Sequence, residues 1–243
     1  MPRFIQYLFS RNLEGKELTD EKIRDFKRIV IAQTGIIFTL FLLAFFKSMP
    51  FPYHIEIAES LFLGCIGLYA FFMWDTLRNY TTNKRVILIN FIIINGVFLF
   101  GLVSTNPFIP MDPTPAYRIA LAVIMGSLLT VEIFVIYFTI LEFFKKDLGL
   151  GIKLWGAAAL YLMIGLSFAS VYEILCVIQP DCLGIDLPLR ALAFMNRMNF
   201  SLMVLGGMEI PYEPSAVLYS VAMIEALWGQ IFIVLIVGRL LVK

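Results

Sequence analysis

The acidic side chains of the apolar segments are the residues best placed to do chemistry in this chain. Glu132, Glu173 and Glu225 each stand inside a long apolar stretch, and Glu209 follows a Gly-Gly pair between two such stretches. A carboxylate within a membrane is costly unless it faces protein, water or a partner. These residues therefore indicate buried structural contacts or an ion pathway.

The sequence gives no indication of metal binding or of covalent catalysis. His54 is the only histidine, and no Cys or Asp cluster stands near it. The chain has no Gly-rich phosphate loop and no hydrolase motif, and its net charge of +1 gives no indication of nucleic acid. We expect no enzymatic activity, no catalytic residue, no metal, no cofactor and no nucleic-acid partner.

The composition places these carboxylates in a membrane protein. Apolar residues make up 60% of the chain and charged residues 15%, whereas a soluble domain carries about 25% charged residues. A bilayer core needs about 20 apolar residues for each spanning helix. Six segments meet this requirement and predict an all-α fold with six transmembrane helices: Ile29–Phe46, Ile57–Trp74, Val86–Ser104, Ile119–Leu141, Leu154–Ile178 and Ser215–Leu241.

The basic residues orient these helices. Fifteen of the 19 Lys and Arg residues fall on the side that holds both termini, and the other side keeps Lys47, Arg118, Arg190 and Arg197. Basic residues accumulate on the cytoplasmic side. We therefore expect a multi-pass protein of the bacterial inner membrane with both termini in the cytoplasm and no removable signal peptide.

Residues 1–28 form a cytoplasmic arm with two parts. An apolar stripe beside Arg3 and Arg11 suits a helix on the membrane surface, and a partly disordered arm is an equal alternative. The stripe consists of Phe4, Ile5, Leu8 and Phe9. Thr19 and Asp20 predict the cap of a second helix that continues into the first span.

Residues 183–214 are too polar to span lipid as a helix. Arg190, Asn196, Arg197 and Asn199 interrupt their apolar part. Asp186 and Pro188 predict a helix start, and the Gly206-Gly207 pair predicts its stop. A re-entrant helix beside a water-filled cavity fits this pattern, and an outer amphipathic helix lying flat is the alternative.

Cys176 and Cys182 stand just before this segment, six residues apart. The charge count places both on the outer side. Their spacing allows a disulfide there, and the pairing stays open at this stage.

Three motifs stand in the C-terminal third of the chain. One is GAAALYLMIGLSFASVYEIL over Gly156–Leu175, and another is Phe200-Ser201-Leu202 followed by Val204-Leu205. The third is the E-A-L-x-G-Q pattern within IEALWGQIFIVLIVGRLL over Ile224–Leu241. In this order they resemble the outer helix, the pore helix and the inner helix of the pore module of bacterial potassium-channel-like proteins. The resemblance covers residues 154–243 and implies a fourfold assembly around a pore.

The filter departs from the family's pattern. The family has a T-V-G-Y-G-D stretch between the pore helix and a proline. In this chain only five residues lie between Leu205, the last residue of the pore-helix motif, and Pro211: Gly206, Gly207, Met208, Glu209 and Ile210. A potassium filter needs successive rings of backbone carbonyls. Five residues that must also return to the surface cannot build these rings, so potassium selectivity by that route is not expected.

The resemblance places the remaining candidate residues. Four copies of Glu209 would ring the axis and favour cations; the alternative is that Glu209 lies on the outer surface and pairs with Arg190 or Arg197. Glu225, Gly229 and Gln230 belong to the inner helix, and Glu225 is expected to contact the pore helix rather than ions. Glu173 is expected to pair with Arg197.

The expected architecture has a cytoplasmic arm (1–28), four peripheral spans (29–146) and a pore module (147–243). The module consists of an outer helix (154–178), a pore helix with its loop (186–213) and an inner helix (215–241). The leading function is passive cation conduction by a homotetramer in the lipid bilayer. A non-conducting channel-like protein with an assembly or regulatory role is the alternative, followed by a small transporter.

Voltage sensing is not expected. The fourth span has no Lys or Arg between Arg118 and Lys145, so it lacks the charges that a membrane potential would move. Conductance of the reconstituted protein should vary only weakly with voltage. A steep conductance–voltage curve in the absence of blocking ions would contradict this prediction.

Overall fold

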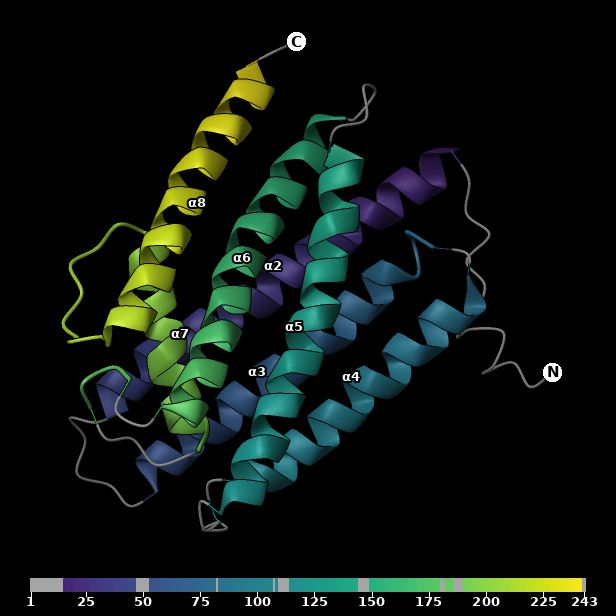
Figure 1. Cartoon of the computed structure of the whole chain (residues 1–243). Helices are drawn as coiled ribbons and strands as arrows, with labels where there is room; N and C mark the ends of the chain where they lie inside the picture. The colour runs from purple at the N-terminus through teal and green to yellow at the C-terminus, as the bar shows by residue number, and fades with distance from the viewer. Residues whose placement is uncertain are drawn as a thin grey trace.

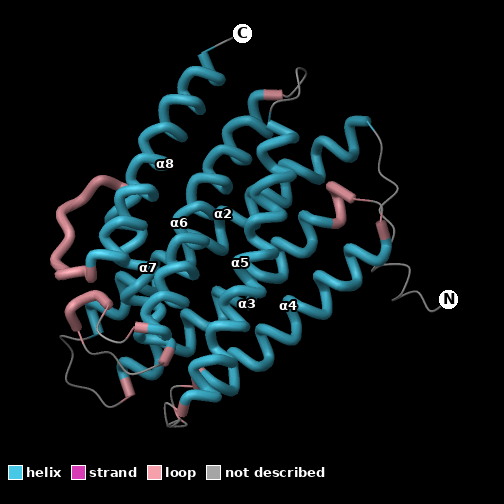
Figure 2. Tube along the Cα trace, viewed as in Figure 1, coloured by secondary structure: helices cyan, strands magenta, loops and turns pink. Residues whose placement is uncertain are grey.

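The chain is all-helical in the part that the computed structural model describes, which comprises residues 15–46, 53–81, 83–106, 108, 114–143, 149–179, 182–185 and 190–241. These residues form seven helices and no strand (Figure 2). The helices are α2 (Gly15–Phe46), α3 (His54–Leu77), α4 (Lys84–Ser104), α5 (Pro115–Phe143), α6 (Leu150–Ile178), α7 (Ala191–Leu205) and α8 (Ala216–Leu241). The predicted surface helix over Phe4–Phe9 and the helix start at Asp186 and Pro188 lie outside the described residues.

Six of the seven helices are long and apolar enough to cross a membrane. They correspond one to one with the six predicted segments, so the prediction of a multi-pass helical membrane protein is confirmed. The seventh, α7, has 15 residues and a length of about 22 Å. This is shorter than a hydrocarbon core of about 30 Å.

The predicted cap at Thr19 and Asp20 is wrong, although the helix does run on into the first span. α2 begins at Gly15, and the Thr19 hydroxyl donates to the Gly15 carbonyl at 3.1 Å within the helix. The polar first part of α2 packs on the end of α3: Asp25 is buried and accepts a hydrogen bond from Asn79. These contacts between helices extend α2 beyond its apolar run.

The six long helices alternate in direction, so the start of α2 and the end of α8 lie on the same side of the bundle (Figure 1). α6 is the central helix and packs against α2, α5, α7 and α8. α4 covers α3 and α5 on one edge, and α8 lies on the opposite edge against α6 and α7. Much of the surface of α8 therefore faces away from its own chain.

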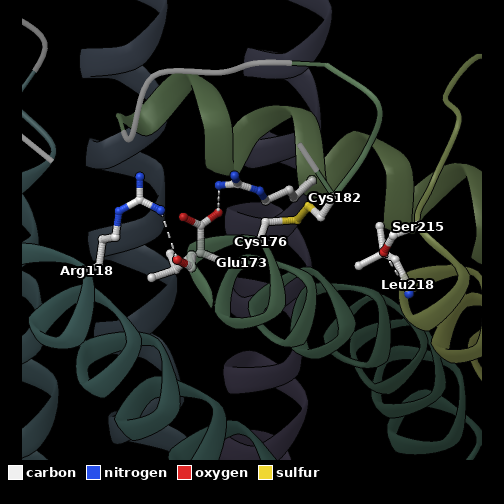
Figure 3. The surroundings of a disulfide bond; sticks show 8 residues. Arg118, Glu173, Cys176, Cys182, Ser215 and Leu218 are labelled. Atoms are coloured by element: carbon white, nitrogen blue, oxygen red, sulfur yellow. Dashed lines mark hydrogen bonds and ion pairs between the residues drawn. A yellow bond between two sulfur atoms is a disulfide. The ribbon is translucent and has the colours of Figure 1, made fainter. Parts of the chain in front are cut away.

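A disulfide joins Cys176 at the end of α6 to Cys182 (Figure 3), with a Cα–Cα distance of 5.2 Å. Both cysteines are buried. The Cys182 carbonyl accepts a hydrogen bond from the Ser215 N–H at 2.8 Å, directly before α8. The cysteine pairing that the sequence left open is thus resolved. Through Cys182, the disulfide and the hydrogen bond to Ser215 connect the end of α6 with the start of α8.

Candidate functional site

The short helix α7 is held at its start by a carboxylate from another helix. Its first residue follows Arg190, whose side chain makes no capping hydrogen bond. Instead the Leu192 N–H donates to Oε1 of Glu59 at 2.7 Å, and Glu59 on α3 is fully buried. A negative charge is favourable at a helix N-terminus because it faces unpaired N–H groups and the positive end of the helix dipole. α3 therefore supplies the cap that α7 lacks.

A buried ion pair holds the middle of α7. Nη1 of Arg197 lies 2.5 Å from Oε2 of Glu173 on α6, and both side chains are at least nine-tenths buried. Figure 3 shows Glu173 one turn before Cys176 of the disulfide. The pairing confirms the expectation for these two residues, and it also means that the Arg197 guanidinium binds within its own chain.

A hydrogen-bonded cluster holds the last part of α7 against α6 and α8. Ser201 Oγ lies 2.5 Å from Oε1 of Glu225 and 2.6 Å from the Gly165 carbonyl. Tyr172 donates its hydroxyl to Oε2 of Glu225 at 2.5 Å. Ser201, Tyr172 and Glu225 are all fully buried. Glu225 therefore contacts the short helix, as expected, and both of its oxygens have partners inside the chain.

The C-terminal end of α7 lies halfway along its neighbours. The Leu205 carbonyl accepts a hydrogen bond from the Tyr161 hydroxyl at 3.0 Å. A Cβ atom at Gly229 would lie 3.1 Å from the same carbonyl, and one at Gly165 would lie 3.1 Å from the Leu205 side chain. Tyr161 and Gly165 stand near the middle of α6, and Gly229 near the middle of α8. Glycine at these two positions allows the helix end to approach this closely.

The Gly206-Gly207 pair ends α7 in the way the sequence predicts. Gly207 has a φ of 65°, which is unfavourable for residues with a Cβ atom. Its N–H donates to the Val204 carbonyl at 3.1 Å, and the Met208 N–H donates to the Met203 carbonyl at 2.9 Å. These two bonds define a Schellman motif, in which a glycine closes the helix and satisfies its last carbonyls.

Beyond this turn the loop is largely uncovered by its own chain. Gly206, Gly207, Met208 and Glu209 are exposed, and Ile210 is half-buried. Among the described residues, no hydrogen bond is formed by the backbone N–H groups of Glu209, Ile210, Tyr212 and Glu213. The next satisfied N–H is that of Ser215, which bonds to Cys182. The loop thus begins at the middle of the helices and returns to their ends with unpaired donors.

Gln230 stands beside this loop on α8. Its amide nitrogen lies about 4.0 Å from the position of a Cβ atom at Gly207, and its side chain is exposed although it stands near the middle of the helix. The five loop residues and Gln230 therefore form one exposed surface, which we call the loop surface. Glu225 and Gly229 lie behind it, buried against α7.

Sequence reasoning found the loop but missed two residues that position it. Glu59 escaped notice because it stands near the start of an apolar span, where a carboxylate is expected to reach the polar boundary. Tyr172 looked like one more aromatic residue of α6. A signal for Glu59 was available: it is an acidic residue within a helix that has no basic residue before Arg78.

Comparison of the chain with protein-family models, curated proteins and solved structures finds no match. The functional argument therefore depends on the residues and geometry of this chain.

The Arg197–Glu173 pair gives a direct test of how α7 is held. Replacing Glu173 with Gln leaves the Arg197 charge buried without its counter-charge, and we expect a loss of about 3 kcal/mol of stability. Replacing both residues, Glu173→Leu with Arg197→Met, removes the uncompensated charge and should recover most of this loss. Thermal unfolding of the detergent-purified protein measures the effect.

The exposed Glu213 provides the control, since Glu213→Gln deletes a carboxylate that makes no ion pair among the described residues. If Glu173→Gln unfolds at the same temperature as Glu213→Gln, the ion pair does not hold α7.

Proposed function

We propose that the chain is the subunit of a pore-loop channel that conducts cations passively, with α7 as a re-entrant pore helix and residues 206–210 as a short filter. The observation that carries this proposal is the position of the α7 C-terminus, halfway along α6 and α8, where it continues into the exposed loop surface.

The depth of the loop, halfway along two membrane-spanning helices, limits what can surround its backbone. Backbone groups in the hydrocarbon region need hydrogen-bond partners, and irregular backbone at that depth is tolerated only inside protein or against a water-filled cavity. The loop leaves the middle of two membrane-spanning helices with at least four N–H groups unpaired. Water in a cavity satisfies these groups, and lipid does not.

The edge position of α8 supports a shared cavity. Among the described helices, α8 makes its main contacts with α6 and α7, and its exposed side includes Gln230 in mid-helix. An amide facing lipid is unfavourable, and polar side chains in membranes commonly pair across helices. In a ring of four copies, each α8 and loop surface would face the common axis and be covered by its neighbours.

The filter that results is short and acidic. Glu209 is an exposed residue of the loop, and Arg197, one of its two possible outer partners, is paired with Glu173. Four Glu209 carboxylates around an axis would concentrate cations, and the carbonyl ends of four α7 helices would add negative potential. Five residues do not provide the stacked carbonyl rings of a potassium filter, so weak selectivity among monovalent cations follows.

The short loop also favours a second candidate, a channel-like protein of the same assembly that does not conduct. The two are distinguished by cation flux into proteoliposomes. Conduction predicts a flux that grows with the amount of protein and has no need of an energy source, and the non-conducting alternative predicts a flux equal to that of empty liposomes.

The Glu209→Gln variant tests the role of the loop. It keeps the side-chain shape and removes the charge, so the reversal potential in a salt gradient should shift toward zero as cation preference falls. Glu213→Gln should change it much less, because Glu213 lies nearer the end of the loop, where salt screens charges over about 10 Å. An unchanged reversal potential in an open Glu209→Gln channel would place Glu209 outside the ion path.

A further inference from the structure

A cavity lies beneath the second half of the edge helix α4, away from the loop surface. α4 is buried at Ile94 and again at Ser104, and no residue between these two is buried. The cavity under this stretch has a volume of about 60 Å³ and is closed by α3, α5, α6 and the start of α7. This is several times the space that one water molecule requires. The packing of α4 therefore leaves room for a further molecule.

The wall opposite α4 is part of the apolar core. It includes side chains that are at most 4% exposed: Phe62 of α3, Leu121 of α5, Leu166 of α6 and Met198 of α7. Apolar cavities stay free of water, and an empty cavity loses the dispersion contacts that a neighbour would make with its walls. The walls therefore favour an apolar occupant.

The cavity lining also contains polar side chains, and five of them interact within the chain. They are Glu173, which pairs with Arg197; Thr105 and Ser170, whose hydroxyls donate to carbonyls of α4 and α6; and Tyr69 and Glu132, which lie side by side. These five side chains have their polar atoms directed at one another or at the backbone. They leave the body of the cavity apolar in character.

Arg190 is the one basic side chain in the lining. It is half-buried, directly precedes α7 and lies near Glu59. A guanidinium group has five N–H donors, so Arg190 can bind an anionic oxygen in addition to its contacts within the chain. Thr105 directly follows α4, whereas Tyr69 and Glu132 stand well inside α3 and α5. The cavity thus runs from a positively charged end, level with the helix ends, toward the middle of the bundle.

We propose that this cavity is a binding site for one membrane phospholipid, which lays part of an acyl chain under α4 and places its phosphate against Arg190. In a bilayer the phosphates lie at the ends of the spanning helices and the acyl chains run inward from them, which matches the direction of the cavity. Lipid tails are as apolar as these walls. Binding is therefore favoured by the contacts that fill the cavity and by the charge-assisted bonds to Arg190. The site is independent of whether the loop conducts.

Photolabelling of the full chain in vesicles tests the proposal. The vesicles consist of phosphatidylcholine with a small amount of phosphatidylglycerol that carries a diazirine in one acyl chain, and mass spectrometry locates the label after illumination. Leu121 and Met198 line the cavity and are buried from the surrounding lipid, so they are labelled only if a chain enters. We expect more label on them than on Val131 of α5 and Phe200 of α7, which are equally buried but lie outside the lining.

Two matched variants test the space under α4. Gly101 lines the cavity, and a Cβ atom there would meet no other atom within 4 Å. Gly101→Leu should therefore occupy the space and abolish the label on Leu121 and Met198. Gly96 lies on the same helix outside the lining and also has open space, so Gly96→Leu should keep that label. Leu99, which is 63% exposed, should be labelled by the surrounding lipid in both variants.

A second probe tests the role of Arg190. Diacylglycerol with the same photoreactive chain lacks the phosphate and so loses the charge-assisted bonds to the guanidinium. Its label on Leu121 and Met198, relative to that on Leu99, should be about tenfold lower than with phosphatidylglycerol.

Three results would overturn the proposal. The first is a label on Leu121 and Met198 no greater than that on Val131 and Phe200, which would show that no chain enters the cavity. This comparison uses the unmodified protein and holds even if a variant does not fold. The second is an equal label in Gly101→Leu and Gly96→Leu, and the third is an equal label from the two probes, which would show that the occupant needs no phosphate.

Discussion

Helix α7 is about 22 Å long and ends at the middle of two helices that are each long enough to cross a bilayer. A helix that stops at such a depth leaves its C-terminal carbonyls, and the loop that follows, in a place where lipid offers no hydrogen bonds. The Schellman turn at Gly206-Gly207 satisfies part of this requirement within the chain. The rest has to be met by water or by other copies of the chain, and this constraint links the fold to the proposed channel.

Three carboxylates from three different helices hold α7 in this position. Glu59 of α3 caps its start, Glu173 of α6 pairs with Arg197 in its middle, and Glu225 of α8 bonds to Ser201 near its end. Each is costly to bury and each is paired with the same short helix. The disulfide of Cys176 adds a covalent tie at the C-terminal end of α6. Glu132 of α5 is a further buried carboxylate, and the hydroxyl groups of Tyr69 and Ser167 lie beside it.

The spans could be predicted from the sequence because membrane helices depend on local composition: each apolar run of about 20 residues became one helix. The Gly206-Gly207 stop and the Glu173–Arg197 pair were also predictable, since both follow from residue type and depth. The start of α2 was not, because the polar residues from Gly15 onward are helical through contacts with α3, such as that of Asp25 with Asn79. The cap on α7 was missed for the same reason, since Glu59 and Leu192 are 133 residues apart.

The central claim is that several copies of the chain enclose the loop surface, and the mass of the intact assembly tests it most directly. Native mass spectrometry of the protein released from lipid nanodiscs counts the copies without assuming a shape. The account predicts four copies of the 27.7 kDa chain, closed around one axis as cyclic symmetry requires. A stable monomer or a plain dimer would leave the loop backbone facing lipid and would contradict the account.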